Sequence, residues 1–118
     1  MSRRTARVGD VLRQEISDVL RRRLHDPRVR LATVNTVEVS PDLRHATVNV
    51  SILGTDAVRA QCLEALRHAS GFIRSQLARN LRNMRTLPDL TFELDRGAEY
   101  SQRIDQLLEH LDDSDQTP

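Results

Sequence analysis

Residues 31–52, LATVNTVEVSPDLRHATVNVSI, decide the fold of this chain. β-Branched residues crowd positions 31–39, and apolar and polar residues alternate over 46–52, which is the period of a strand with one buried face. The Ser-Pro-Asp step at 40–42, between the two runs, is turn chemistry. The stretch therefore predicts a β-hairpin with a connection of about five residues.

Helical patterns flank this hairpin on both sides. Apolar residues recur in steps of three and four over residues 5–24, and the proline after Asp26 predicts that this first helix ends near that residue. A second apolar stripe runs over 55–84, which is long for one straight helix in so small a domain. We therefore predict two helices there, joined by a helix kink. The kink residues are Ala69, Ser70 and Gly71.

The rest of the chain completes an α+β sandwich. Leu-Pro-Asp at 87–89 breaks the helical pattern, and alternation over 90–94 predicts a third strand. A last helix is expected over 104–111, whereas residues 112–118 hold no apolar residue and are expected to be a disordered acidic tail. The order α-β-β-α-α(kinked)-β plus a C-terminal helix predicts a three-stranded sheet with helices packed on one face. We expect one domain over residues 1–111.

The charge is segregated along the chain. All 18 basic residues are arginine, and the net charge is +1. Residues 1–86 hold 16 arginines against eight acids (+8), and residues 87–118 hold two against nine (−7). Codon bias in a GC-rich genome would explain the choice of arginine over lysine, but it would not explain where the charges fall. The asymmetry predicts a polyanionic partner.

The inventory of reactive residues points away from catalysis. Without lysine there is no P-loop lysine or Schiff base, and the four glycines are scattered. The four histidines lack partners at metal-ligand spacing, and the single cysteine, Cys62, lies in an apolar helical pattern that predicts a buried, inert thiol. We expect no catalytic residue, no metal and no cofactor. The chain also lacks an apolar run long enough for a membrane span, so a cytoplasmic protein is expected. We also expect a monomer.

Taken in order and spacing, several segments resemble bacterial ribosome-binding factor A over roughly residues 3–111. They are LHDPRV at 24–29, VEVSPDL at 37–43, ASGFIR at 69–74, LRNMRTLPDL at 81–90 and RIDQLL at 103–108. The resemblance implies a type II KH-like fold, a single-stranded nucleic-acid module, in which an Ala-x-Gly kink replaces the usual Gly-x-x-Gly loop. Ala69 and Gly71 match that kink.

The family's members are not enzymes. The resemblance implies that the chain binds the free small (30S) ribosomal subunit and its 16S rRNA. It further implies help with late maturation and 5′-end processing of that rRNA, notably in the cold. Contacts with ribosomal proteins stay open. The alternative is a protein–protein adaptor on a KH-like scaffold, because the missing Gly-x-x-Gly weakens the ordinary RNA clamp. A nuclease is a weaker hypothesis, since the acidic run falls in the tail.

Arginine suits RNA binding because its guanidinium can grip a phosphate with two hydrogen bonds. The residues expected to contact RNA are Arg3, Arg4, Arg7, Arg67, Ser70, Gly71, Arg74, Arg82 and Arg85. Arg74, Arg82 and Arg85 lie on one side of the kink and are the expected cluster, whereas the alignment of Arg67 across the kink stays open. The three N-terminal arginines are expected to form a mobile basic arm, and the two kink residues to allow close approach of the RNA backbone.

Two features near these candidates have ordinary structural explanations. Phe72 follows the kink and could stack on a base, but a chain with three aromatic residues more often needs such a ring in its core, so we expect it to be buried. The arginine run at 21–23 is expected to cap and solvate the end of the first helix. For any single arginine, a solvated charge with an acidic neighbour is an open alternative. For the whole set, RNA binding is favoured.

Overall fold

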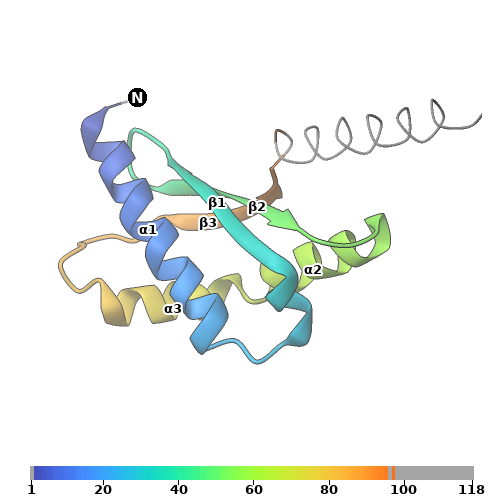
Figure 1. The fold of residues 1–118 in the computed structure, drawn as a ribbon. Coiled ribbons are helices and arrows are strands. Elements are labelled where there is room, and N and C mark those ends of the chain that lie inside the picture. The colour runs from blue at the N-terminus through green and yellow to red at the C-terminus, as the bar shows by residue number, and fades with distance from the viewer. Residues whose placement is uncertain (1, 96, 98–118) are drawn as a thin grey trace, which may run out of the picture.

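The structure is a computed structural model, and it describes residues 2–95 and 97. The elements in chain order are α1 (Arg3–Arg22), the 3₁₀ helix η1 (Pro27–Leu31), β1 (Ala32–Val39), β2 (His45–Ile52), α2 (Asp56–His68), α3 (Ser70–Asn80) and β3 (Asp89–Leu94) (Figure 1). The predicted order α-β-β-α-α-β is therefore confirmed. The expected last helix at 104–111, the tail at 112–118 and the domain end at residue 111 lie outside the described residues.

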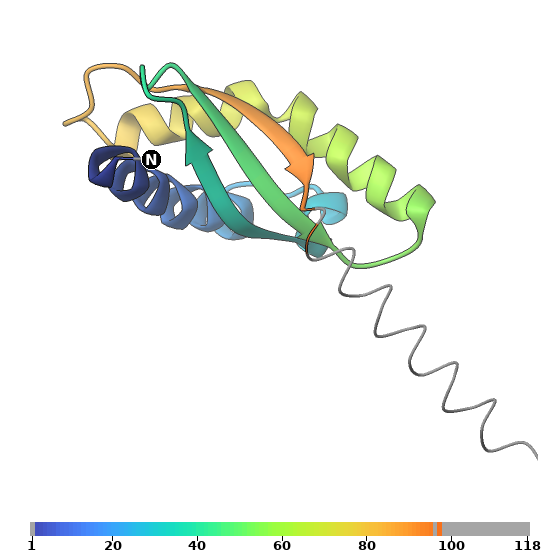
Figure 2. The same ribbon diagram turned by 90° about the horizontal axis from the view of Figure 1, so that it is seen from above.

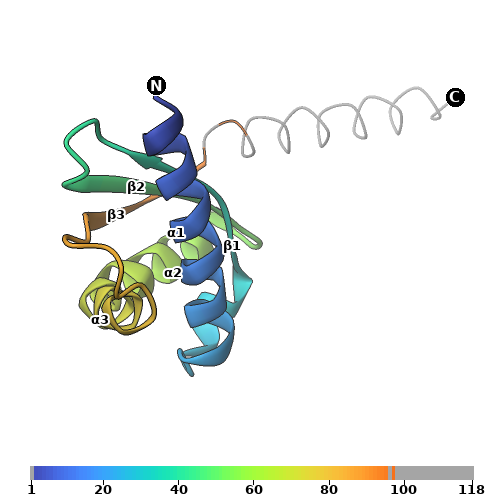
Figure 3. The same cartoon turned by 90° about the vertical axis from the view of Figure 1, so that its left-hand side faces the viewer.

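The strands form a three-stranded sheet in the order β1-β2-β3. β1 and β2 pair antiparallel as the predicted hairpin, and β3 returns through α2 and α3 to pair parallel with β2. Figures 2 and 3 show the three helices on one face of the sheet, as predicted. That face carries the core, in which Val48, Val50 and Phe92 are fully buried. The other face carries the polar residues of the alternating pattern.

The first helix differs from its predicted bounds at both ends. It begins at Arg3 because the Ser2 side chain caps it, the Ser2 Oγ accepting a hydrogen bond from the Thr5 N–H at 3.2 Å. It ends at Arg22 instead of near Asp26. Asp26 instead caps η1, since its carboxylate accepts a hydrogen bond from the Arg28 N–H at 3.0 Å. Pro27 therefore does mark a helix boundary, but it is the start of η1 and not the end of α1.

α1 lies very close to the sheet at Gly9. A Cβ atom added to this buried glycine would lie only 2.4 Å from the carbonyl oxygen of Val37 in β1. Glycine therefore allows the helix backbone to approach the strand backbone, and the fully buried Leu12 and Ile16 follow it into the core. The sequence offered no signal for this close approach.

The predicted kink is confirmed, but the second helix of the pair is shorter than predicted. α2 ends at His68, Ala69 follows with φ −84° and ψ −2°, and α3 begins at Ser70. α3 then ends at Asn80 instead of near residue 84, so residues 81–88 form a loop. The apolar spacing continues into this loop because Leu81, Met84 and Leu87 pack against the core without being helical. No helix among the described residues is both long and apolar enough to cross a membrane.

Candidate nucleic-acid interface

α3 and the loop at 81–88 enclose a groove of about 570 Å³. We call it the basic groove. Its lining residues are Gly71, Arg74, Ser75, Ala78, Arg82, Met84, Arg85, Thr86 and Leu87. Four of the residues predicted to contact RNA are thus brought together: Gly71, Arg74, Arg82 and Arg85. The apolar loop residues hold the loop against the core, which keeps its two arginines beside α3.

The three arginines of the basic groove differ in how freely they can bind an anion. The guanidinium of Arg74 donates a hydrogen bond to the Leu87 carbonyl at 3.0 Å and lies 3.8 Å from the Asp89 carboxylate, and its side chain is 47% exposed. Arg74 therefore also anchors the loop to the helix. Arg82 and Arg85 are exposed, and no carboxylate within residues 2–95 pairs with either of them. These two cations are available to a phosphate.

Gly71 leaves open space at the edge of the basic groove. Apart from the neighbouring residues and backbone of its own helix, no atom lies within 4 Å of the position that a Cβ would occupy, and its φ angle is not positive. Neither packing nor backbone conformation thus requires glycine here. No side chain caps the start of α3. Ser70 is half-buried beside it, so the exposed backbone of the kink belongs mainly to Gly71.

The other predicted residues lie outside the basic groove. Arg67 does not line the groove; its guanidinium donates a hydrogen bond to the Phe92 carbonyl of β3 at 3.4 Å. Arg3, Arg4 and Arg7 belong to α1, so the expected mobile arm is wrong, because the Ser2 cap starts the helix before them. Arg7 lines a separate hollow of about 310 Å³ that Met84 shares with the basic groove.

One arginine beside the basic groove was missed from the sequence. The Asp89 N–H donates a hydrogen bond to the Arg44 carbonyl at 2.8 Å, and Arg74 lies near the carboxylate of the same Asp89. The hairpin end is held in shape by Asp42, whose carboxylate accepts hydrogen bonds from the Ser40 hydroxyl at 2.6 Å and the Arg44 N–H at 3.0 Å. These bonds lower the pKa of Asp42. Only the parallel pairing of β2 and β3 brings the exposed Arg44 to this end.

The exposure of Phe72 contradicts its predicted place in the core, whereas the burial predicted for Cys62 is confirmed. The Phe72 side chain is 42% exposed on α3, because the kink and the core contacts of Ile73 and Leu77 turn it toward solvent. Cys62 is 1% exposed, and burial raises the pKa of its thiol, as expected for an unreactive cysteine.

Among residues 2–95 and 97, no three histidine, cysteine or carboxylate side chains are grouped to hold a metal ion.

Comparison with known proteins gives consistent matches. The sequence model of the ribosome-binding factor A family matches residues 4–108. Ribosome-binding factor A of Thermomicrobium roseum is 44% identical over 110 residues, which cover 93% of this chain and 84% of that protein.

Solved structures agree with these matches. The crystal structure of ribosome-binding factor A from Thermus thermophilus has a TM-score of 0.69 at 32% identity, covering 78% of this chain and 97% of that one. The solution NMR structure of a Thermotoga maritima protein described as a putative ribosome-binding factor A has a TM-score of 0.69 at 35% identity, with coverage of 79% and 88%. A homology model of the Thermus thermophilus factor, fitted into a cryo-EM map of its 30S complex, has a TM-score of 0.64 at 32% identity, with coverage of 78% and 96%. On its sequence and its KH-like fold alike, the chain belongs to the ribosome-binding factor A family.

Proposed function

We propose that this protein binds the small (30S) ribosomal subunit through its 16S rRNA and assists late maturation of that subunit. The observation that carries the proposal is the basic groove, which gathers Arg74, Arg82 and Arg85 beside the open backbone of Gly71. Family membership supports it, since the Thermus thermophilus relative has been fitted into a map of a complex with the 30S subunit. Contacts with ribosomal proteins are compatible with the same docking.

Within this proposal the basic groove grips the RNA backbone. The planar guanidinium groups of Arg82 and Arg85 each match a phosphate with two parallel hydrogen bonds. Arg74 holds the loop in place and adds positive charge behind them. The missing side chain of Gly71 lets a sugar-phosphate segment lie against α3. Because the affinity comes mainly from phosphate contacts, it should fall steeply as the salt concentration rises. For single-stranded RNA, each phosphate contact contributes about −0.7 to the slope of log K against log salt concentration.

Binding alone is sufficient for the proposed role. A protein that binds one arrangement of the rRNA better than another shifts the population toward the first by the difference in affinity. Processing of the rRNA 5′ end would then act on the arrangement so favoured. The effect matters most in the cold, where rRNA crosses barriers between structures more slowly. We propose that the protein does this in the cytoplasm, as a monomer and without enzymatic activity.

Co-sedimentation with purified 30S subunits tests this function. Wild-type protein is expected to travel with free 30S subunits at low salt and to be released as salt rises. Arg82→Glu/Arg85→Glu should abolish association, because two phosphate contacts become repulsions. Arg74 is left unchanged, since replacing it would also remove the hydrogen bond to Leu87. Arg79→Glu is the control within α3, because Arg79 is exposed but does not line the groove.

The outcomes separate this function from its alternatives. Association only with complete ribosomes, or undiminished association of the double variant, would refute the proposal or its choice of surface. Filter binding with 16S rRNA fragments decides between an RNA-binding factor and a protein–protein adaptor. An adaptor would still associate with 30S subunits but would not retain naked rRNA on the filter.

A further inference from the structure

A second basic surface lies at the far end of α1, away from the basic groove. We define it by the exposed arginines Arg21, Arg22 and Arg23 at the end of α1 and Arg28 and Arg30 in η1. Residues 21–31 hold these five arginines against one carboxylate, that of Asp26. Such a density of like charge on one small surface disfavours the compact state unless something neutralises it.

Carboxylates within the described chain neutralise only part of this surface. Arg21 pairs with Asp18 at 2.7 Å, and Arg28 pairs with Asp26 at 2.7 Å. Within residues 2–95, no carboxylate pairs with Arg22, Arg23 or Arg30.

The helix dipole accounts for only part of this charge. It favours positive charge within the last turn of α1, where Arg21 and Arg22 already stand. Arg30 lies with Arg28 in the last turn of η1, a helix of only five residues. The helix ends thus favour positive charge here, but folding leaves Arg22, Arg23 and Arg30 without a carboxylate partner within residues 2–95.

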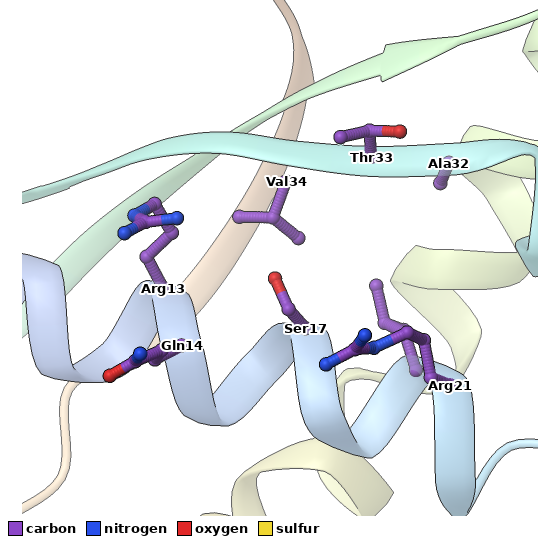
Figure 4. Close-up of a pocket in the computed structure, with 8 residues that line it drawn as sticks. Arg13, Gln14, Ser17, Arg21, Ala32, Thr33 and Val34 are labelled. Carbon is purple, nitrogen blue, oxygen red and sulfur yellow. The ribbon is translucent and has the colours of Figure 1, made fainter.

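A hollow of about 360 Å³ between α1 and β1 adjoins this surface through Arg21. Its lining residues are Arg13, Gln14, Ser17, Leu20, Arg21, Ala32, Thr33 and Val34. Figure 4 shows Arg13 and Ser17 rising from α1 toward β1, with the Arg21 guanidinium turned toward Ser17. Arg13 is half-buried and has no carboxylate partner within residues 2–95. The guanidinium groups of Arg13 and Arg21 and the hydroxyl of Ser17 line this hollow, and such donors are suited to a phosphate.

The second basic surface and the basic groove lie on opposite sides of the molecule. Arg7, near the start of α1, shares a hollow with the loop that bounds the groove. Arg22 follows 15 residues later, which is about 22 Å along the helix axis. Figures 1 and 2 agree: the loop before β3 lies at one side and η1 at the other, with α1 between them. One RNA segment in the groove would leave the second surface free.

We propose that the second basic surface, with its adjoining hollow, is a second binding site for an RNA backbone, and that one protein molecule bridges two RNA segments. The inference rests on the proposed function, because it adds a second contact to the same kind of partner. A protein partner fits less well, since protein interfaces centre on apolar anchors. The exposed apolar residues here are Leu31 and its hydrogen-bonded neighbour Leu53, beside five arginines. By holding two segments, the factor would raise the effective concentration of each near the other.

Native mass spectrometry with two short RNA hairpins of different mass tests the bridge. The wild-type chain is expected to form a complex of one protein with two RNAs. Arg22→Gln/Arg23→Gln/Arg30→Gln should bind one RNA only, because it removes three positive charges from the second basic surface. These three side chains make no hydrogen bond within the described residues, so the variant is expected to keep its fold. With one longer RNA, the same change should reduce the salt slope of binding by about 2 to 3. Arg82→Glu/Arg85→Glu should also lose the two-RNA complex.

The control variant is Arg79→Glu/Thr91→Glu, which changes the net charge by the same three units at exposed positions outside both surfaces. It should keep the two-RNA complex. A wild-type chain that saturates with one RNA, or a triple variant that still binds two, overturns the inference while the proposed function stands. A wild-type chain that binds no RNA overturns both. If a synthetic peptide of residues 98–118, which holds six acids, binds the wild type but not the triple variant, and no second RNA binds, the surface recognises acidic peptide and the inference is wrong.

Discussion

The same substitution at two glycines should change stability in opposite directions. Gly9 and Gly71 both lie in helices, and alanine is the better helix former by up to about 1 kcal/mol. At Gly71 the new methyl group meets no atom within 4 Å beyond the neighbouring residues and backbone of its own helix. At Gly9 it would lie 2.4 Å from the Val37 carbonyl oxygen, closer than the 3.0 Å that real Cβ contacts respect. We therefore expect Gly71→Ala to stabilise the protein and Gly9→Ala to destabilise it.

The magnitudes follow from what has to move. The obstacle at Gly9 is strand backbone, so α1 itself must lift from β1, and Leu12 and Ile16 lose packing in the core. Overpacking of this kind costs about 1–3 kcal/mol, occasionally more, and the gain in helix propensity offsets part of it. A net loss of about 1–2 kcal/mol is expected. Gly71→Ala should gain about 0.5 kcal/mol, since it lies in the first turn of α3.

Urea unfolding followed by circular dichroism measures both changes. With a slope of about 1–2 kcal/mol per molar urea, the midpoint should fall by roughly 1 M for Gly9→Ala and rise slightly for Gly71→Ala. A Gly9→Ala variant as stable as the wild type would refute the close approach of α1 to β1. A Gly71→Ala variant that is clearly less stable would show that the space beside α3 is filled. If Gly71→Ala binds rRNA more weakly although it is more stable, glycine serves the RNA.

Three further predictions concern the core, the thiol and the acid range. Phe92→Ala should cost about 3–5 kcal/mol because the ring is fully buried, whereas Phe72→Ala should cost less than about 1 kcal/mol; urea melts measure both, and equal losses would contradict the placement of Phe72. Native Cys62 should react with a thiol reagent at about pH 8 only on unfolding, since burial raises its pKa; rapid labelling without urea would count against this. The hydrogen bond from the Arg28 side chain lowers the pKa of Asp26 below 3.8, so its stabilising effect is present above that value and is lost as the pH falls through the folded pKa. Asp26→Asn should flatten the acid loss of stability below about pH 4 in urea melts, and an unchanged slope would argue against the pair.

Local patterns were sufficient for most of the fold. The period of two and the turn residues located β1 and β2 to within about a residue, because a strand's pattern depends on its own side chains. The kink was predicted where it occurs. The end of α3 was not, because Leu81, Met84 and Leu87 keep helix-like spacing on a loop that packs against the core. Apolar spacing reports burial, and burial does not require a helix.

The candidate site was predicted in part and for an incomplete reason. Arg74, Arg82 and Arg85 do lie together, but not because one helix carries all three: a loop folded against α3 places Arg82 and Arg85 beside Arg74. Phe72 was assigned to the core because composition alone cannot say which way a helix turns after a kink. Arg44 reaches the same end of the molecule through the parallel pairing of β2 and β3, which joins residues far apart in the chain.

Sequence by itself determined the element order, the hairpin, the kink, the segregation of charge and the family, because each depends on residue types near one another in the chain. Tertiary structure decided where the charges gather. Packing of the 81–88 loop on the core built the basic groove, and the direction of α1 across the sheet set a second arginine surface on the opposite side. Charge is carried by residue type, but a binding surface depends on distances between side chains, and only the folded chain sets those distances.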